Sequence, residues 1–151
     1  MEDCLICQRI ALIKEGKNRY FVKELKSGYV VLGDHQYYKG YTLLLSKVHT
    51  NELHKLRPEE RTQFLEDMAL VSEAVYKAFK PSKLNYELLG NSDSHLHWHI
   101  FPRYLDDPKP DYTTWVVPTS IRKSEKTIPR DENLGTLKKQ LLTEIDKLVG
   151  F

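Results

Sequence analysis

The chain has 151 residues, of which 40% are hydrophobic and 29% are charged, and its formal net charge is +2. A chain of this length can bury one core without disulfide bonds, and this composition excludes a disordered, collagen-like or disulfide-stapled protein. The small net charge excludes a general attraction for nucleic acid polymers, so we expect local geometry to hold any anion that binds.

The N-terminal sequence MEDCLICQRI lacks the basic flank and apolar stretch of a signal peptide, and no run approaches the roughly 18 apolar residues of a membrane span. We therefore expect a cytoplasmic protein without a membrane partner, in which Cys4 and Cys7 stay reduced. Their C-x-x-C spacing is typical of metal or redox sites, but no βαβ unit surrounds the motif, which disfavours a redox role. The plainest alternative is two small buried residues on a short helix.

Five segments rich in β-branched, aromatic and aliphatic residues are predicted to be strands. They are residues 19–25, 29–34, 41–46, 84–89 and 95–101. Gly28 lies in a short connection between the first two segments, and Gly90 follows the fourth at hairpin spacing. Short turns between most of the strands favour an antiparallel sheet.

A long helix is predicted from Pro58 to Phe79, between the third and fourth strands. Pro58 suits a first helical turn, Pro81 prevents continuation, and the apolar residues between them recur at helical steps. Residues 132–149 repeat this pattern, whereas residues 106–130 are predicted to be irregular. The expected fold class is α+β, with about five antiparallel strands, one long covering helix and a C-terminal helix.

Three of the six histidines fall within HLHWHIF, residues 95–101. Alternate side chains of a strand share a face, so we expect His95, His97 and His99 on one face and the apolar residues between them on the core face. Same-face neighbours are roughly 6.6 Å apart, so a single ion could bind two of these histidines but hardly all three. The row must therefore serve at least two purposes.

The chemistry of imidazole favours a phosphate as the target of this row. A neutral imidazole is a nucleophile near pH 7, and a protonated one donates hydrogen bonds to anionic oxygens. Phosphoryl transfer needs an in-line attacking group together with donors for the equatorial oxygens. A central nucleophile beside a donor meets this need, and the turn containing Asn91 and Ser92 adds polar groups before the strand.

The H-x-H-x-H motif followed by two apolar residues resembles the histidine triad (HIT) superfamily of nucleotidyl hydrolases and transferases. The segments CLIC, VVLGDHQYYKGYTLLLSKVH and LLGN, together with the long helix, occur in the order of that family over residues 3–104. The resemblance implies a HIT-like fold and a homodimer. It makes residues 1–105 a nucleotide-binding catalytic domain, and residues 106–151 a C-terminal extension packed on that domain or on a partner subunit.

The resemblance also implies a role for each site residue. His97 attacks the α-phosphorus of a purine nucleotide and forms a covalent nucleotidyl-histidine intermediate, which water resolves, while backbone carbonyls fix the tautomer of His97. His99 contacts the phosphate oxygens. Asn91 and Ser92 lie near the phosphate or the leaving group, and Asp34 holds the ribose hydroxyls. The implied substrates are dinucleoside polyphosphates or nucleoside phosphoramidates, cleaved without a catalytic metal.

One position departs from the family pattern. Many members carry an additional histidine, which supports the catalytic one, where Tyr41 stands in this chain. A phenol forms hydrogen bonds but does not accept a proton near pH 7, so Tyr41 either orients His97 or marks a different substrate and rate. His35 is expected to point away from the face of Asp34, without a catalytic role, and Arg103 to lie at the surface.

A closed tetrahedral zinc site needs two ligands besides Cys4 and Cys7. His49, just after the third strand, and His95, at the start of the histidine strand, are the candidates. In zinc-bearing HIT proteins the corresponding residues close such a site, so the resemblance implies a structural zinc. His54 is expected to be solvated and not to bind the metal.

Three alternatives stay open. The same fold can transfer a nucleotidyl group to a phosphorylated acceptor instead of to water. A metal-dependent hydrolase or isomerase would use His95 and His97 to hold a catalytic ion, and would lose turnover with a chelator. A non-catalytic nucleotide-binding module would still bind nucleotide after His97→Asn and would form no covalent adduct.

Overall fold

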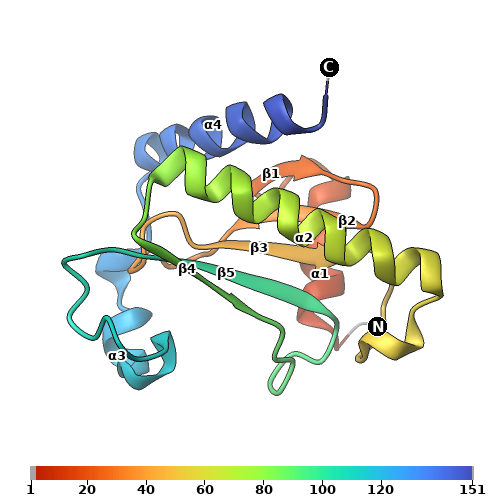
Figure 1. Cartoon of the computed structure of the whole chain (residues 1–151), viewed down its shortest axis with the longest axis horizontal. Coiled ribbons are helices and arrows are strands. Elements are labelled where there is room, and N and C mark those ends of the chain that lie inside the picture. The colour runs from red at the N-terminus through yellow and green to blue at the C-terminus, as the bar shows by residue number, and fades with distance from the viewer. Residues whose placement is uncertain (1–2, 151) are drawn as a thin grey trace.

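The computed structural model describes residues 3–150, so the first two residues of the predicted domain and the last residue of the predicted extension lie outside the described residues. Its centre is a five-stranded sheet (Figure 1). In chain order the strands are β1 (Phe21–Glu24), β2 (Gly28–Leu32), β3 (Thr42–Ser46), β4 (Lys83–Glu87) and β5 (His97–Arg103). They lie in the order β1-β2-β3-β5-β4, and every neighbouring pair is antiparallel. The predicted α+β class with an antiparallel sheet is confirmed.

Four α-helices and three 3₁₀ turns accompany the sheet in the described part of the chain. The helices are α1 (Leu5–Lys14), α2 (Pro58–Phe79), α3 (Thr119–Arg122) and α4 (Asp131–Leu148), and the turns are η1 (Leu53–Lys55), η2 (Thr114–Val116) and η3 (Glu125–Thr127). The bounds of α2 are those predicted, because Pro58 starts it and the Glu60 carboxylate accepts a hydrogen bond from the backbone N–H of Arg57. Within residues 3–150 no helix combines the length and apolar character needed to cross a bilayer.

The larger core lies between α2 and one face of the sheet, and α4 packs beside α2 and against β1 (Figure 1). The sheet contributes Val30, Leu32, Leu44 and Ile100, α2 contributes Phe64, Val71 and Val75, and α4 contributes Leu134, Leu137, Leu141 and Ile145. Burial of one such side chain stabilises the fold by about 1.5–3 kcal/mol. The predicted helix after residue 131 is therefore part of the same core as the sheet.

On the opposite face, α1 covers only part of the sheet. Ile6 and Ile10 of α1 pack on Tyr29, Val31 and Leu45 of β2 and β3. The rest of this face is not covered by α1. There the side chains of β3 and β5 that point away from α2 line an open cavity. The short helix considered as an alternative for the cysteine motif is thus present, and it begins directly after Cys4.

Strand β5 begins two residues later than predicted, and β4 and β5 pair as the expected antiparallel hairpin but through a longer connection than the Gly90 turn. Residues 88–96 form the longer connection between β4 and β5. Just before β5, the backbone N–H of Leu96 donates to the carbonyl of Thr50 at 2.8 Å instead of joining the strand ladder. His95 therefore precedes β5 and is free to turn toward other partners.

Arg103 corrects a second prediction, because its side chain is buried and not on the surface. Its Nε forms an ion pair of 2.6 Å with Asp107, and its Nη1 donates to Asn85 at 2.7 Å. The same guanidinium donates to the carbonyls of Lys109 and Tyr112. A planar group with five donors can satisfy a loop in this way, so Arg103 holds the chain that follows β5 against the sheet.

We expect Leu141→Ala to lower the free energy of unfolding by about 2–5 kcal/mol, because Leu141 of α4 is fully buried in the core that α4 shares with α2. The free energy of unfolding from urea titration measures the effect. Lys139→Ala is the matched control on the exposed face of α4, with an expected change within about 0.5 kcal/mol. A loss no larger than that of the control would contradict the role of α4 in the core.

Candidate functional site

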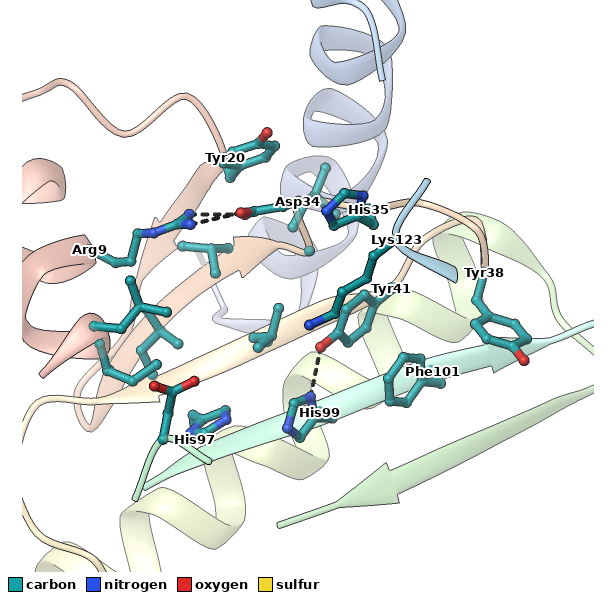
Figure 2. Close-up of a pocket in the computed structure, with 18 of the residues that line it drawn as sticks. Arg9, Tyr20, Asp34, His35, Tyr38, Tyr41, His97, His99, Phe101 and Lys123 are labelled. Carbon is teal, nitrogen blue, oxygen red and sulfur yellow. Dashed lines mark hydrogen bonds and ion pairs between the residues drawn. The ribbon is translucent and has the colours of Figure 1, made fainter. Parts of the chain in front are cut away.

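A cavity of about 220 Å³ opens on the α1 face of the sheet. Side chains of β3 and β5 form its floor, α1 and β2 form one side, and residues after position 114 close another (Figure 2). Its polar lining consists of Arg9, Asn18, Tyr20, Asp34, His35, Tyr37, Tyr38, Tyr41, Asp93, His97, His99, Arg122 and Lys123. Two of the three histidines of the motif thus meet in one cavity, as the alternation along the strand predicts.

His97 is held in a single tautomer. Its Nδ1–H donates to the carbonyl of His95 at 2.7 Å. When the ring is neutral, the other nitrogen, Nε2, carries a free lone pair, and it has no hydrogen-bond partner among residues 3–150. A neutral imidazole with an unprotonated Nε2 in a cavity is a potential nucleophile.

Tyr41 is hydrogen-bonded to His99 and not to His97, which disfavours the first of the two alternatives for Tyr41, an orienting role on His97. The Tyr41 hydroxyl lies 2.7 Å from Nδ1 of His99. The phenol has no other acceptor among the described residues, so it donates to Nδ1 and leaves the ring proton of His99 on Nε2. Gly33 makes this geometry possible, because a Cβ at that position would overlap the Tyr41 ring.

Burial keeps this pair of side chains uncharged. Burial first, and then the charges of His97 and Lys123, lower the pKa of His99 to about 3. Burial also raises the pKa of Tyr41. His99 is therefore a neutral donor through Nε2–H near pH 7, not the protonated donor that the sequence suggested.

Asp34 lies in the cavity wall as predicted, but its carboxylate already has a partner. Arg9 of α1 donates to both of its oxygens, at 2.9 and 2.7 Å (Figure 2). The hydrogen bond to Asp34 raises the pKa of the Arg9 guanidinium. Each carboxylate oxygen retains acceptor capacity, so the pair can still accept from a hydroxyl group. Arg9 could not be predicted as a site residue from the sequence, because no local motif marks this arginine or the helix α1 that carries it.

Two of the other predicted polar residues lie outside the cavity. Asn91 and Ser92 are exposed in the connection before β5 and do not line the cavity, whereas the adjacent Asp93 does. His35 corrects the expectation that it points away from Asp34, because it lines the same cavity, where its Nδ1 lies 2.9 Å from the Thr127 hydroxyl. The connection between β4 and β5, residues 88–96, is longer than the predicted turn. Asp93 of this connection therefore reaches the cavity in place of Asn91 and Ser92.

Cys4, Cys7, His49 and His95 converge beside the cavity, with their ligand atoms within 4.8 Å of one another. Cys7 Sγ lies 3.2 Å from His49 Nδ1 and 3.5 Å from His95 Nδ1, and the two Nδ1 atoms are 3.1 Å apart. Ligand atoms around a tetrahedral zinc lie roughly 3.4–3.8 Å apart, given bonds of about 2.1 Å to nitrogen and 2.3 Å to sulfur. The predicted ligand set therefore has the composition of a zinc site, and its atoms need to move by only a few tenths of an ångström to reach this spacing.

The orientation of His95 suits a metal ligand. Its Nε2–H donates to the carbonyl of Ser46 at 2.7 Å, which leaves the lone pair on Nδ1 facing the two sulfurs. Burial lowers the pKa of His95, which also favours the neutral form that binds metals. His97, by contrast, donates through its Nδ1. This separation disfavours a catalytic ion shared by His95 and His97.

The amino-acid sequence of the chain matches one known protein family. A sequence model described as the HIT domain matches residues 16–106. Protein hit of Bacillus subtilis (strain 168) is 31% identical over 109 residues, which are 68% of this chain and 72% of that protein. The residues matched by the family model include every strand and both cavity histidines, but neither α1 nor the chain after residue 106.

Solved structures share the fold. A Zn-bound histidine triad family protein from Mycobacterium smegmatis matches with a TM-score of 0.66 and 21% identity, covering 97% of each chain. Plasmodium falciparum diadenosine triphosphate hydrolase, in complex with cyclomarin A, matches with a TM-score of 0.63 and 16% identity, covering 85% of this chain and 78% of its own. The similarity extends over nearly the whole chain in the first case.

We expect the purified protein to contain about one zinc per chain, since four ligands satisfy a closed tetrahedral site. Cys7→Ser removes one thiolate, so zinc content and melting temperature should both fall. Elemental analysis and thermal unfolding measure these changes. His54→Asn, a substitution of an exposed histidine outside the cluster, is the control. Full zinc content in Cys7→Ser would contradict the ligand set.

We expect the His99 ring to stay neutral between pH 8 and 5, because its pKa in the folded protein is lowered to about 3. The unfolded chain takes up this proton near pH 6.5, so the contribution of His99 to the free energy of unfolding falls as the pH drops from about 6.5 toward 3. NMR titration of the histidine rings tests this directly. A His99 signal that titrates between pH 5 and 8 would contradict the neutral assignment.

Proposed function

The chain belongs to the HIT domain family, and from that premise we propose that it cleaves a phosphoanhydride or phosphoramidate at the α-phosphate of a purine nucleotide, through a covalent nucleotidyl-histidine intermediate. One observation carries this proposal: the Nδ1–H of His97 donates to the carbonyl of His95, which leaves Nε2 as an unprotonated nitrogen on the cavity side. The family resemblance already implies His97 as the nucleophile, and this hydrogen bond adds a physical reason for that choice.

In the first step, the lone pair of His97 Nε2 forms a bond to the α-phosphorus while the bond from phosphorus to the leaving group breaks. The ring becomes a cationic, nucleotidylated imidazole. Its Nδ1–H points at the partial negative charge of the His95 carbonyl, at 2.7 Å, so the same hydrogen bond that sets the tautomer also stabilises this charge. A phosphate leaving group departs as an anion and needs no proton, whereas the nitrogen of a phosphoramidate takes up a proton from water as its bond to phosphorus breaks and departs as a neutral amine.

In the second step, water attacks the phosphorus from the side vacated by the leaving group, and the phosphorus–nitrogen bond breaks. The electron pair of that bond returns to Nε2 and restores the neutral ring, while the proton of the water passes to solvent. His99 donates its Nε2–H to a phosphate oxygen in both steps, and the Tyr41 hydroxyl holds the His99 ring in place. The products are a nucleoside monophosphate and the free leaving group.

The nucleoside occupies the end of the cavity next to α1. Apolar side chains of Ile6, Val31 and Leu43 offer a surface for a flat base, and Asp34 lies close to them with its Arg9 partner. The fixed carboxylate accepts hydrogen bonds from the ribose hydroxyls, as the resemblance implies. Because Arg9 holds both oxygens of Asp34, the carboxylate is already oriented before substrate binds.

The proposed zinc has a structural role. Cys4, Cys7, His49 and His95 would supply four ligands to the ion, which satisfies a structural zinc site. These residues come from the chain before α1, from α1, from the chain after β3 and from the residue that precedes β5. A zinc held by them would fix the backbone at His95, whose carbonyl accepts the hydrogen bond of His97.

Hydrolysis is the proposed outcome, and transfer of the nucleotidyl group to another acceptor is the variant of the same chemistry. The shared fold of the Plasmodium falciparum diadenosine triphosphate hydrolase supports dinucleoside polyphosphates as a first substrate class to assay. A non-catalytic nucleotide-binding module is the competing function. Homodimer assembly and a cytoplasmic location stay predictions.

We expect brief exposure to diadenosine triphosphate or adenosine 5′-phosphoramidate, followed by rapid quenching, to reveal an adenylyl adduct on His97. Phosphorus–nitrogen bonds of this kind are cleaved by acid and survive alkali, so mass spectrometry after each quench identifies the adduct. His97→Asn removes the nucleophile, and turnover should fall by at least about 1,000-fold.

His54→Asn is the control for this experiment, since His54 is exposed and belongs to neither histidine cluster. A wild-type protein that binds nucleotide but gives no adduct and no turnover would favour the binding module. Turnover that survives His97→Asn would remove the proposed nucleophile.

A further inference from the structure

A segment outside the family match completes the cavity. Residues 114–127, here called the C-terminal strap, contain η2, α3 and η3 and follow the matched region that ends at residue 106 (Figure 1). Three strap side chains line the cavity: Trp115, Arg122 and Lys123. Two walls of the pocket thus lie outside the family match: α1, and this strap.

Specific contacts hold one end of the strap on β4 and β5. The Trp115 ring meets His99 and Phe101 edge-on, with ring centroids 5.8 and 5.9 Å apart. Its indole N–H donates to the Glu87 carboxylate. The Arg122 guanidinium lies 4.7 Å above the centre of the indole ring. Aromatic and cation–π contacts of this kind give the strap a defined position beside the histidines.

The other end of the strap is bonded to the chain after β2. The backbone N–H of Gln36 donates to the carbonyl of Thr127 at 2.7 Å, and the Thr127 hydroxyl lies 2.9 Å from Nδ1 of His35. Because both ends are held, the strap positions the side chains of α3 relative to the cavity. Lys123 follows α3 directly.

Lys123 lines the cavity as an exposed cation whose ammonium group is available to a ligand. Arg9 is paired with Asp34, and Arg122 covers Trp115 and donates to the carbonyl of Val117 at 2.8 Å. The Lys123 ammonium has no hydrogen-bond or ion-pair partner within residues 3–150. Figure 2 shows it pointing into the cavity, toward Tyr41 and His99. Its charge is one cause of the lowered pKa of His99, which places it within electrostatic reach of that ring.

The charges along the cavity are not uniform. Asp93 lines the cavity near the start of β5, while Arg122 and Lys123 line it beside the later residues His99 and Phe101. His99 and Tyr41 are neutral, so they cannot balance the charge of a polyphosphate. A phosphate chain that extends from His97 therefore meets repulsion toward Asp93 and attraction toward Lys123.

We propose that Lys123 is a specificity-determining residue that binds phosphate groups beyond the α-phosphate, so that this chain prefers substrates with an anionic phosphate leaving group. The inference rests on the proposed function and narrows its substrate class to dinucleoside polyphosphates and related phosphoanhydrides. Nucleoside phosphoramidates, whose leaving amine carries no phosphate charge, gain little from Lys123. The C-terminal strap supplies this preference from outside the matched domain.

The test compares kcat/KM for diadenosine triphosphate and adenosine 5′-phosphoramidate in wild type and Lys123→Gln. We expect the substitution to lower kcat/KM for diadenosine triphosphate about tenfold, as loss of a charge-assisted contact does, and to change the value for the phosphoramidate less than about twofold. Lys123→Arg keeps the charge and should recover most of the loss. Lys126→Gln is the matched control, because Lys126 is exposed on the same strap and does not line the cavity.

A binding measurement separates this inference from the proposed reaction. In His97→Asn, which lacks the nucleophile, calorimetry gives the ratio of the dissociation constants of AMP and ATP. We expect ATP to bind more tightly than AMP, and Lys123→Gln in the same background to bring the ratio close to 1.

The outcomes distinguish the two proposals. If the wild type turns over neither substrate but the AMP-to-ATP ratio depends on Lys123, the proposed reaction fails and the phosphate-binding role stands. If the wild type turns over both substrates but Lys123→Gln leaves the substrate preference and the binding ratio unchanged, the role of Lys123 is overturned. Equal losses for both substrates, with no change in the binding ratio, overturn it as well.

Discussion

The pleat of strand β5 is the constraint on which both the core and the pocket depend. Trp98 and Ile100 are buried against α2, while the alternate residues His97 and His99 face the cavity. The register with β3 pairs Leu45 with His97 and Leu43 with His99. A shift of one residue would exchange the two faces, placing imidazoles in the core and the indole in the cavity. The free energy gained by burying the apolar face therefore also positions the catalytic candidates.

The three histidines of one motif differ because each Nδ1 atom has a different neighbour. The Nδ1 of His95 faces two thiols and a second imidazole, the Nδ1–H of His97 donates to a backbone carbonyl, and the Nδ1 of His99 accepts from a phenol. These partners set the tautomer and the charge of each ring. A metal ligand, a nucleophile and a neutral donor can thus arise from three identical side chains within five residues. Backbone geometry links the first two, since the carbonyl that holds His97 belongs to His95.

Because His99 is neutral near pH 7, the positive charge that balances a bound phosphate must come from another side chain. Burial makes the charged forms of the His99 imidazole and the Tyr41 phenol unfavourable, because neither charge is solvated there. Both side chains therefore stay neutral near pH 7, and the floor of the cavity carries little charge. Arg9 forms an ion pair with Asp34, and the Arg122 guanidinium stacks on the indole ring of Trp115. A site of this design leaves the binding of additional phosphates to a residue on the rim. That residue, Lys123, follows the residues that the HIT domain model matches, 16–106.

Local patterns in the sequence were sufficient for the five strands, for α2 and α4, and for several residues of the candidate site. Pro58, Pro81 and the apolar spacing between them determined the bounds of α2, and the alternation in HLHWHIF determined which residues share a face. The C-x-x-C spacing and the two separate histidines were sufficient to name a ligand set whose atoms converge in the structure. Such features depend on neighbours within a few residues, or on ligand chemistry that only certain side chains possess.

Tertiary packing alone decided the remaining features, because they depend on residues that are far apart in the chain. Arg9 meets Asp34, Arg103 is buried by the loop it satisfies, and Tyr41 reaches His99 across the missing Cβ of Gly33. No periodicity in one segment can encode the distance to another segment. The protonation of His99 and the position of Lys123 follow from burial and from the contacts that hold the C-terminal strap. The sequence thus determined which chemical groups were present, and the fold decided which of them meet and in what charge state.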